Sequence, residues 1–370
     1  MIRQNFNADW TVEKGDGNSR MNSFLGNTQT KTVHLPYDAM IHEARTPDTK
    51  NGAQTGFYPG GEYIFQKHFT APQAWQGKPV SLVFEGVYQT ALVYLNGWLL
   101  TRNVNGYAEF TVEAGPYLKY GADNLLKVIA DNSLEPNSRW YTGSGIYRPV
   151  RLLVGNKVYL PQDTVRITTR EADEGFALLD VTAQVQSAST VTERVTLQQT
   201  ICREGTAVLT DRQNLLLQPG ESRTVSFRYC VDSPALWSPE NPNLYTSTMQ
   251  VLEGEEELDR EETGFGIRTL SIDAAHGVRI NGQTVKLRGA CIHHDNGILG
   301  AATLPDAEER RIRQLKEAGF NAIRSSHHPA GRALLDACDR YGVLVMDELS
   351  DVWNVRKNPY DYALYFEQDW

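Results

Sequence analysis

The sequence lacks a long hydrophobic run and an excess of basic charge. No window among its 370 residues approaches the roughly 18 to 20 consecutive apolar residues that span a bilayer, so we expect no membrane partner. Its 36 basic and 45 acidic residues give a net charge of -9, which is the wrong sign for binding phosphates over a broad surface. We therefore expect no nucleic-acid partner.

Cysteines are few and widely spaced. Cys202, Cys230, Cys291 and Cys338 form no Cys-x-x-Cys pair, which argues against a zinc knuckle and against a dense disulfide framework. Residues 1–10 contain no apolar segment of the secretory type. Together these features predict free thiols in a reducing compartment and a cytoplasmic location.

Short strand patterns fill the first two thirds of the chain, whose length suggests two or three domains. Apolar or alternating runs at 80–85, 91–95 and 125–130, with a hairpin signal at Asn96-Gly97, predict an all-β sandwich up to about residue 155. Alternation continues to Arg268, and about 110 residues of this kind match an immunoglobulin-like sandwich. The acidic stretch 253–257 is interpreted as a solvated hairpin tip.

After Arg268 the pattern changes to alternating strands and helices. We predict strands at 284–292, 321–324 and 343–346, with a helix from Pro305 to Gly319 and another at 331–341 between them. Such a βαβαβ series is typical of a parallel sheet buried on both faces.

Polar side chains follow each of these three strands. The first strand runs into His293-His294-Asp295, the second into Arg324-Ser325-Ser326-His327-His328, and the third into Asp347-Glu348. One histidine at a strand end is as often structural as functional. Because ligands bind beyond the carboxyl ends of parallel strands, three such ends in succession predict a site.

Two chemistries fit this cluster. A metal-dependent hydrolase would use the histidines and carboxylates as ligands, but His293 and His294 are adjacent on a strand and point to opposite faces, as do His327 and His328. Sugar chemistry would use the same groups as hydrogen-bonding partners for hydroxyls. Aromatic residues could stack on sugar faces, although core packing is their commoner role: Trp140, Tyr141 and Trp353.

Several motifs in fixed order resemble glycoside hydrolase family 2, the β-galactosidase and β-glucuronidase family, over nearly the whole chain. The stretches that carry the resemblance are 131–133, 137–141, 143–150, 236–245, 264–268, 288–295, 321–329 and 345–348. The resemblance implies a jelly-roll sugar-binding domain over 1–155, an immunoglobulin-like β-sandwich over 156–268 and, over 269–370, the first three βα units of an incomplete (β/α)8 TIM barrel.

The resemblance also implies a retaining exo-β-glycosidase. The Cys-Ile-His-His-Asp sequence of the first barrel strand is closer to the β-galactosidase branch, so terminal β-D-galactosides are the expected substrates. Residues 348–353 depart from that branch, and a β-glucuronidase remains an alternative. The implied partner is a β-glycoside or oligosaccharide, bound by an enzyme that in full length is a homo-oligomer.

The implied substrate-binding residues come from the strand ends and from one loop of the first domain: His293, His294, Asp295, Arg324, His327, Asp347, Glu348 and Trp140. Both catalytic glutamates are expected beyond Trp370, the first directly after an asparagine, and the chain contains no Asn-Glu pair. We expect this segment alone to be inactive; a non-catalytic carbohydrate-binding or scaffold chain is the alternative of another class. No cofactor or metal ligand is expected, and a bound Mg²⁺ or Na⁺ would be structural or activating.

Overall fold

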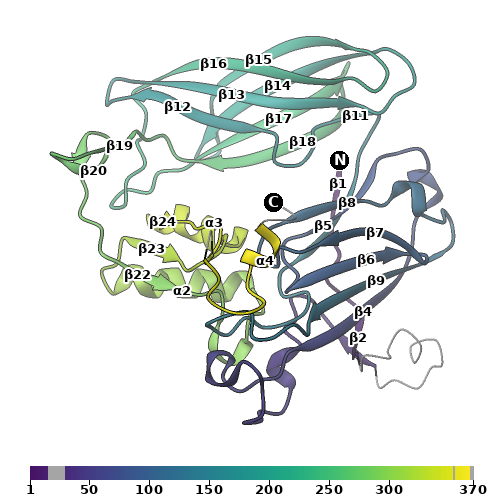
Figure 1. The fold of residues 1–370 in the computed structure, drawn as a ribbon. Coiled ribbons are helices and arrows are strands. Elements are labelled where there is room, and N and C mark those ends of the chain that lie inside the picture. Colours follow the sequence, from purple (N-terminus) through teal and green to yellow (C-terminus); the bar gives the residue numbers. More distant parts are fainter. Residues whose placement is uncertain (16–29, 353–354, 367–370) are drawn as a thin grey trace.

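The computed structural model describes residues 1–15, 30–352 and 355–366. It contains two β-sandwiches followed by a small α/β region, arranged in this order along the chain (Figure 1). None of the helices in the described ranges is long and apolar enough to cross a membrane. The predicted fold class is confirmed, whereas the boundaries at 155 and 268 stay predictions.

The first sandwich packs two antiparallel sheets around a common core. Its four-stranded sheet contains, in spatial order, β1 (Ile2–Asn5), β10 (Val150–Val154), β5 (Val80–Phe84) and β8 (Phe110–Glu113). Its six-stranded sheet contains β3 (Lys31–Val33), β2 (Trp10–Lys14), β4 (Gly61–Thr70), β9 (Asp123–Asn132), β6 (Thr90–Leu95) and β7 (Trp98–Asn103). Short 3-10 helices lie in its loops: η1 (Met40–His42), η2 (Gly52–Thr55), η3 (Gln73–Trp75) and η4 (Gly115–Tyr117).

Alternation along these strands explains the core. Trp10, Phe65, Phe84 and Leu126 point inward and are fully buried between the two sheets, while their chain neighbours face outward. The predicted hairpin at Asn96-Gly97 is confirmed, since it joins β6 to β7.

The second sandwich lies above the first in Figure 1 and repeats this construction. One sheet contains β11 (Val158–Tyr159), β13 (Phe176–Ser187), β12 (Arg166–Ala172) and β16 (Ser222–Asp232). The other contains β15 (Thr206–Leu217), β14 (Glu193–Arg203), β17 (Tyr245–Glu253) and β18 (Glu256–Phe265). The acidic stretch forms the turn between β17 and β18, as predicted.

The third region begins with a small antiparallel sheet: β19 (Leu270–Asp273), β20 (Gly277–Ile280) and β21 (Gln283–Thr284). The parallel part follows with β22 (Gly289–Ile292), η5 (Gly297–Leu299), α2 (Pro305–Glu317), β23 (Ala322–Ser325), α3 (Arg332–Tyr341), β24 (Leu344–Met346) and α4 (Ala363–Phe366). Both predicted long helices are confirmed.

The single strand predicted at 284–292 is wrong. Asn281 and Gly282 have φ angles of 51° and 76°, so they form a tight turn that folds Gln283 and Thr284 back onto β20. The parallel strand therefore starts only at Gly289. The Asn-Gly dipeptide at 281–282 is a turn signal in the sequence, and the prediction of one continuous strand did not take it into account.

The prediction of a sheet buried on both faces is also wrong. Ile292, Ile323 and Val345 pack against α2 and α3 on one face. On the other face Cys291, Arg324 and Met346 lie side by side in register, and Met346 is 59% exposed. Among the described residues, helices cover only this first face of the three-stranded sheet.

The α3 helix docks the third region onto both sandwiches. Arg332, its first residue, donates from Nε to Glu109 of the first sandwich at 2.7 Å and forms an ion pair with Asp163 of the second. Near its other end, the Asp339 carbonyl accepts a hydrogen bond of 2.9 Å from Trp237 Nε1. The position of β23 and β24 therefore depends on both sandwiches.

Replacing Arg332 with Gln should destabilise this junction. The substitution removes a cation shared by Glu109 and Asp163, and because its side chain is partly exposed we expect a loss of about 1–2 kcal/mol. Arg340→Gln is the matched control, since Arg340 pairs with Glu309 on the surface and should change stability by less than about 0.5 kcal/mol. Thermal unfolding of the three proteins checks this; equal effects would contradict a junction role.

Candidate active site

The predicted strand-end residues partly converge at the carboxyl edge of the parallel sheet. Glu348, after β24, accepts a hydrogen bond from Arg324 Nε at 2.5 Å and lies 2.8 Å from His327 Nδ1. Because a carboxylate can only accept, a proton of His327 is assigned to Nδ1. Arg324, His327 and Glu348 thus form one fixed group.

His293, after β22, forms the adjoining wall with Trp140. The His293 Nδ1 lies 2.6 Å from the Ser326 carbonyl, which assigns the proton to Nδ1 here as well. The Trp140 ring, from the loop before β10, stacks on the His293 ring with centroids 5.1 Å apart and meets His327 edge-on at 5.5 Å. The structure therefore brings Trp140 to the predicted cluster from a different domain.

The aromatic residues have structural contacts that limit sugar stacking. One face of the Trp140 ring is covered by His293, and the residue as a whole is only 9% exposed. Tyr141 donates its hydroxyl to Asp38 at 2.6 Å and so holds the loop. Trp353 lies outside the described residues.

Asp38, which sequence reasoning missed, fixes the loop that carries Trp140. This buried carboxylate accepts hydrogen bonds from Tyr141 and from the backbone N–H groups of Ser144, Ala301 and Met40. Burial raises its pKa, and these four donors oppose that rise. A Cβ on Gly300 would lie 2.2 Å from Asp38 Oδ2, so only glycine allows this close approach.

His294 is separated from the cluster in which it was predicted. Its side chain is buried at the interface with the first sandwich, where Nε2 lies 2.8 Å from the Thr142 carbonyl. The reason is the alternation of neighbouring side chains along an extended chain, which places His293 and His294 on opposite sides. The position of His294 suits docking of the Trp140 loop rather than contact with a substrate.

His328 accompanies His294 at this interface. Its ring stacks on Tyr107 of the first sandwich at 4.2 Å and lies 4.8 Å from the His294 ring. Burial, with the Arg148 cation nearby, lowers the pKa of His328 to about 3. Burial, with His328 as neighbour, also holds the pKa of His294 well below its usual value. Both imidazoles are therefore neutral in the folded protein near pH 7.

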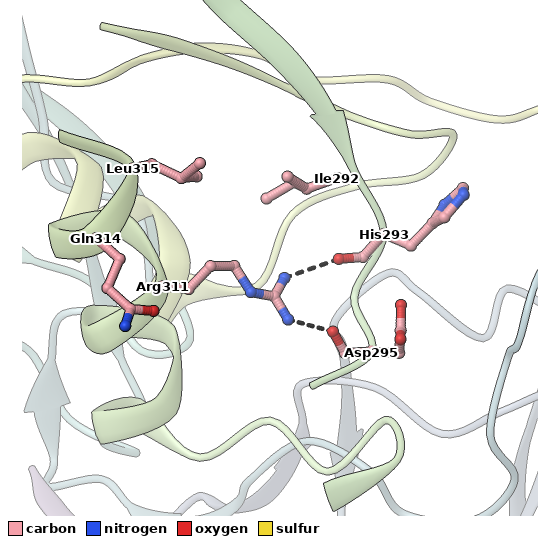
Figure 2. Close-up of a pocket in the computed structure, with 6 residues that line it drawn as sticks. All are labelled: Ile292, His293, Asp295, Arg311, Gln314 and Leu315. Carbon is pink, nitrogen blue, oxygen red and sulfur yellow. Dashed lines mark hydrogen bonds between the residues drawn. The ribbon is translucent and has the colours of Figure 1, made fainter. Parts of the chain in front are cut away.

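Asp295 and Asp347 lie at the margins of the cluster. Asp295 lines a cavity of about 400 Å³ beside α2, together with Ile292, His293, Arg311, Gln314 and Leu315. Figure 2 shows the Arg311 guanidinium reaching the carbonyls of His293 and Asp295, while the His293 ring points away from the helix. This cavity is thus on the helix side of β22, and the ring of His293 points away from it.

Asp347 Oδ1 accepts a hydrogen bond from the Ala330 N–H at 2.9 Å and supports the loop after β23.

Asp351 is a second residue that sequence reasoning missed. Its carboxylate accepts from Arg139 Nη2 at 2.5 Å and from Lys357 Nζ at 2.9 Å, and it lies 4.0 Å from His327 Nε2. Burial raises the pKa of Asp351, but the hydrogen bonds from Arg139 and Lys357 outweigh burial and hold it below the usual value. The only signal in the sequence was that residues 348–353 depart from the β-galactosidase pattern.

The arrangement suits a ligand rich in hydroxyl groups. Because Nδ1 of His293 and of His327 is bonded within the protein, Nε2 of each ring is the atom left to bond a ligand, while the half-exposed Arg324 guanidinium supplies donors at a position fixed by Glu348. In the described ranges, no three side chains of His, Cys, Asp or Glu are grouped so that they could hold a metal ion.

Comparison with known families agrees with this geometry. A model described as glycosyl hydrolase 2 galactose-binding domain-like matches residues 10–176. The models for glycosyl hydrolases family 2 and for the TIM barrel domain of that family match residues 158–268 and 274–360.

Three relatives align with nearly all of this chain, whereas the chain spans less than half the length of each of them. A β-galactosidase of Bacteroides ovatus, BoGH2A, is 38% identical over 99% of this chain and 43% of its own length. A putative β-glucuronidase of Formosa agariphila is 32% identical over 100% of this chain and 35% of its own length. The solved structure of a family 2 member from Bacteroides cellulosilyticus has a TM-score of 0.94 and 36% identity, covering 100% of this chain and 48% of that one.

Acidification should destabilise the interface that holds His294 and His328. The pKa of each ring is depressed in the folded state, so each takes up a proton on unfolding once the pH falls below about 6.5. We expect unfolding free energy to fall between pH 6.5 and 5 by up to about 1.4 kcal/mol per pH unit for each ring.

Chemical denaturation at several pH values measures this slope. His328→Asn should reduce it by about one proton, whereas His34→Asn, at an exposed position, should not change it. An unchanged slope in the His328 variant would show that this ring does not account for the acid sensitivity.

Cys291 should be the most reactive thiol. Hydrogen bonds from Ser326 and Arg324 lower the pKa of its exposed side chain, whereas burial raises the pKa of Cys338 to about 12. Iodoacetamide at neutral pH, followed by peptide mass spectrometry, should modify Cys291 before Cys230, which is also exposed, and leave Cys338 intact. Ser326→Ala should slow the reaction at Cys291. Faster modification of Cys230 would contradict this prediction.

Proposed function

Because the chain belongs to glycosyl hydrolases family 2, we propose that it forms part of a retaining exo-β-glycosidase acting on terminal β-D-galactosides. The observation that carries the proposal is the convergence of His293, Arg324 and His327 at the carboxyl edge of the parallel sheet, beside Trp140. The similarity to the β-galactosidase of Bacteroides ovatus supports the choice of sugar.

In this proposal the chain binds the terminal sugar. His293, Arg324, His327 and Asp347 hydrogen bond to its hydroxyl groups, and Glu348 orients Arg324 and His327. Fixed partners raise the rate when their hydrogen bonds are stronger in the transition state than in the ground state. Retention requires two carboxyl groups about 5–5.5 Å apart, and we propose that both come from glutamates on later strands of the barrel, outside this chain.

A β-glucuronidase is the second candidate, and one observation favours it. Arg139 and Lys357, each with a half-exposed side chain, share the single carboxylate of Asp351, so positive charge is in excess beside His327. A surplus of cationic donors is suited to the carboxylate of a uronic acid. The relative from Formosa agariphila, named a putative β-glucuronidase, supports this alternative.

We propose that no cofactor is required. A calcium-binding mutant has been described for the β-glucuronidase 2 of Bacteroides uniformis, whose structure is 27% identical with a TM-score of 0.82 over 97% of this chain and 44% of that one. A cation in the present protein, its homo-oligomeric state and its cytoplasmic location remain proposals.

Activity of a longer protein that contains this chain and its later barrel strands tests the proposed function. It should hydrolyse p-nitrophenyl β-galactoside faster than p-nitrophenyl β-glucuronide, and the reverse order would favour the second candidate. His327→Ala removes a partner of the sugar and should lower kcat/KM about 2- to 10-fold, since a hydrogen bond between neutral groups contributes roughly 0.5–1.5 kcal/mol. His276→Ala, at an exposed site in the small antiparallel sheet, is the control. Inactivity on both substrates would reject the proposal.

A further inference from the structure

Asp351 joins two segments that approach the site from different domains. Its side chain is only 8% exposed, and it accepts hydrogen bonds from Arg139 of the first sandwich and from Lys357. Lys357 Nζ also donates to the Asp351 carbonyl at 2.7 Å, so this one ammonium group bonds both the side chain and the backbone of Asp351. The two cations are about 40% exposed, so Asp351 is the one well-buried charge of this group.

The contact with Arg139 sits at one end of the loop that carries Trp140. At the other end Tyr141 donates to Asp38, and the Thr142 carbonyl contacts His294. The Trp140 ring lies between these two attachments, and it is parallel to the His293 ring within 7°. Asp38 and His294 hold the later end whatever occurs at Asp351. At the earlier end Asn137 bonds within the first sandwich, and Arg139, next to Trp140, is held by Asp351.

We propose that Asp351 is a positioning residue: by holding Arg139, it keeps the Trp140 ring stacked on His293 and so shapes the wall of the sugar site. The assignment of that wall to a sugar rests on the proposed function, but the stack itself does not. Without the carboxylate, Arg139 and Lys357 have half-exposed side chains that can turn to solvent, so the residue next to Trp140 loses its attachment to Asp351.

The position of the Trp140 ring can be read directly by nuclear magnetic resonance. The ring current of an indole shifts protons above its face upfield, so the ring protons of His293 report the stack in this 370-residue chain without any substrate. The ring-proton signals of His293 are identified as those that disappear in the His293→Asn variant. A role in overall stability alone would lower the unfolding temperature and leave this shift unchanged.

Four variants make the test specific. Asp351→Asn keeps the shape of the side chain and removes its charge, and Arg139→Gln removes the partner from a half-exposed position. Asp351→Glu keeps the charge and should restore part of the shift. Asp180→Asn is the matched control, because Asp180 also accepts from two arginines, Arg170 and Arg228, but lies in the second sandwich.

We expect Asp351→Asn and Arg139→Gln each to move the His293 signals downfield, the double variant to add little to either, and Asp180→Asn to leave them in place. Unchanged His293 signals in Asp351→Asn overturn the proposal; if that variant does not fold, unchanged signals in Arg139→Gln overturn it. If the shift is lost as expected but the longer enzyme hydrolyses neither glycoside, the proposed function fails and the positioning role of Asp351 stands.

Discussion

The buried carboxylate of Asp38 is the interaction on which the site wall depends. It binds N–H and O–H donors from its own loop, from the Trp140 loop and from Ala301, which follows β22. An ionised carboxylate away from water is tolerated only when such donors surround it, because its desolvation costs several kcal/mol. The loop of the first sandwich and the first parallel strand are therefore held in one geometry, which fixes Trp140 over His293.

Much of the fold could be predicted from local patterns. The Asn96-Gly97 hairpin and α2, with Pro305 at its start and Gly319 after its end, depend on residues close in sequence, so the sequence alone identifies them. The convergence of Arg324, His327 and Glu348 followed from the rule for parallel strand ends, since that rule concerns topology rather than individual contacts.

The remaining parts depend on partners distant in the chain. Asp38 meets Ala301 across 263 positions, and Arg139 meets Asp351 across 212, and no periodicity signals such pairs. His294 was misplaced for a different reason. The alternation of side chains along a strand was used to argue against a metal site, but it was not used to separate His294 from His293 among the predicted sugar-binding residues. Whether one or both faces of the parallel sheet are covered could not be read from the sequence, because apolar strands look alike in the two cases.

The α3 helix connects the second sandwich to the site mechanically. Arg332 attaches its first turn to Glu109 and Asp163, and Trp237 attaches its last turn, while β23 precedes it and β24 follows it. A tilt of the second sandwich would move this helix with it and displace the ends of both strands. The second sandwich can in this way set the spacing between the ends of β23 and β24, although the cluster of Arg324, His327 and Glu348 contains none of its side chains.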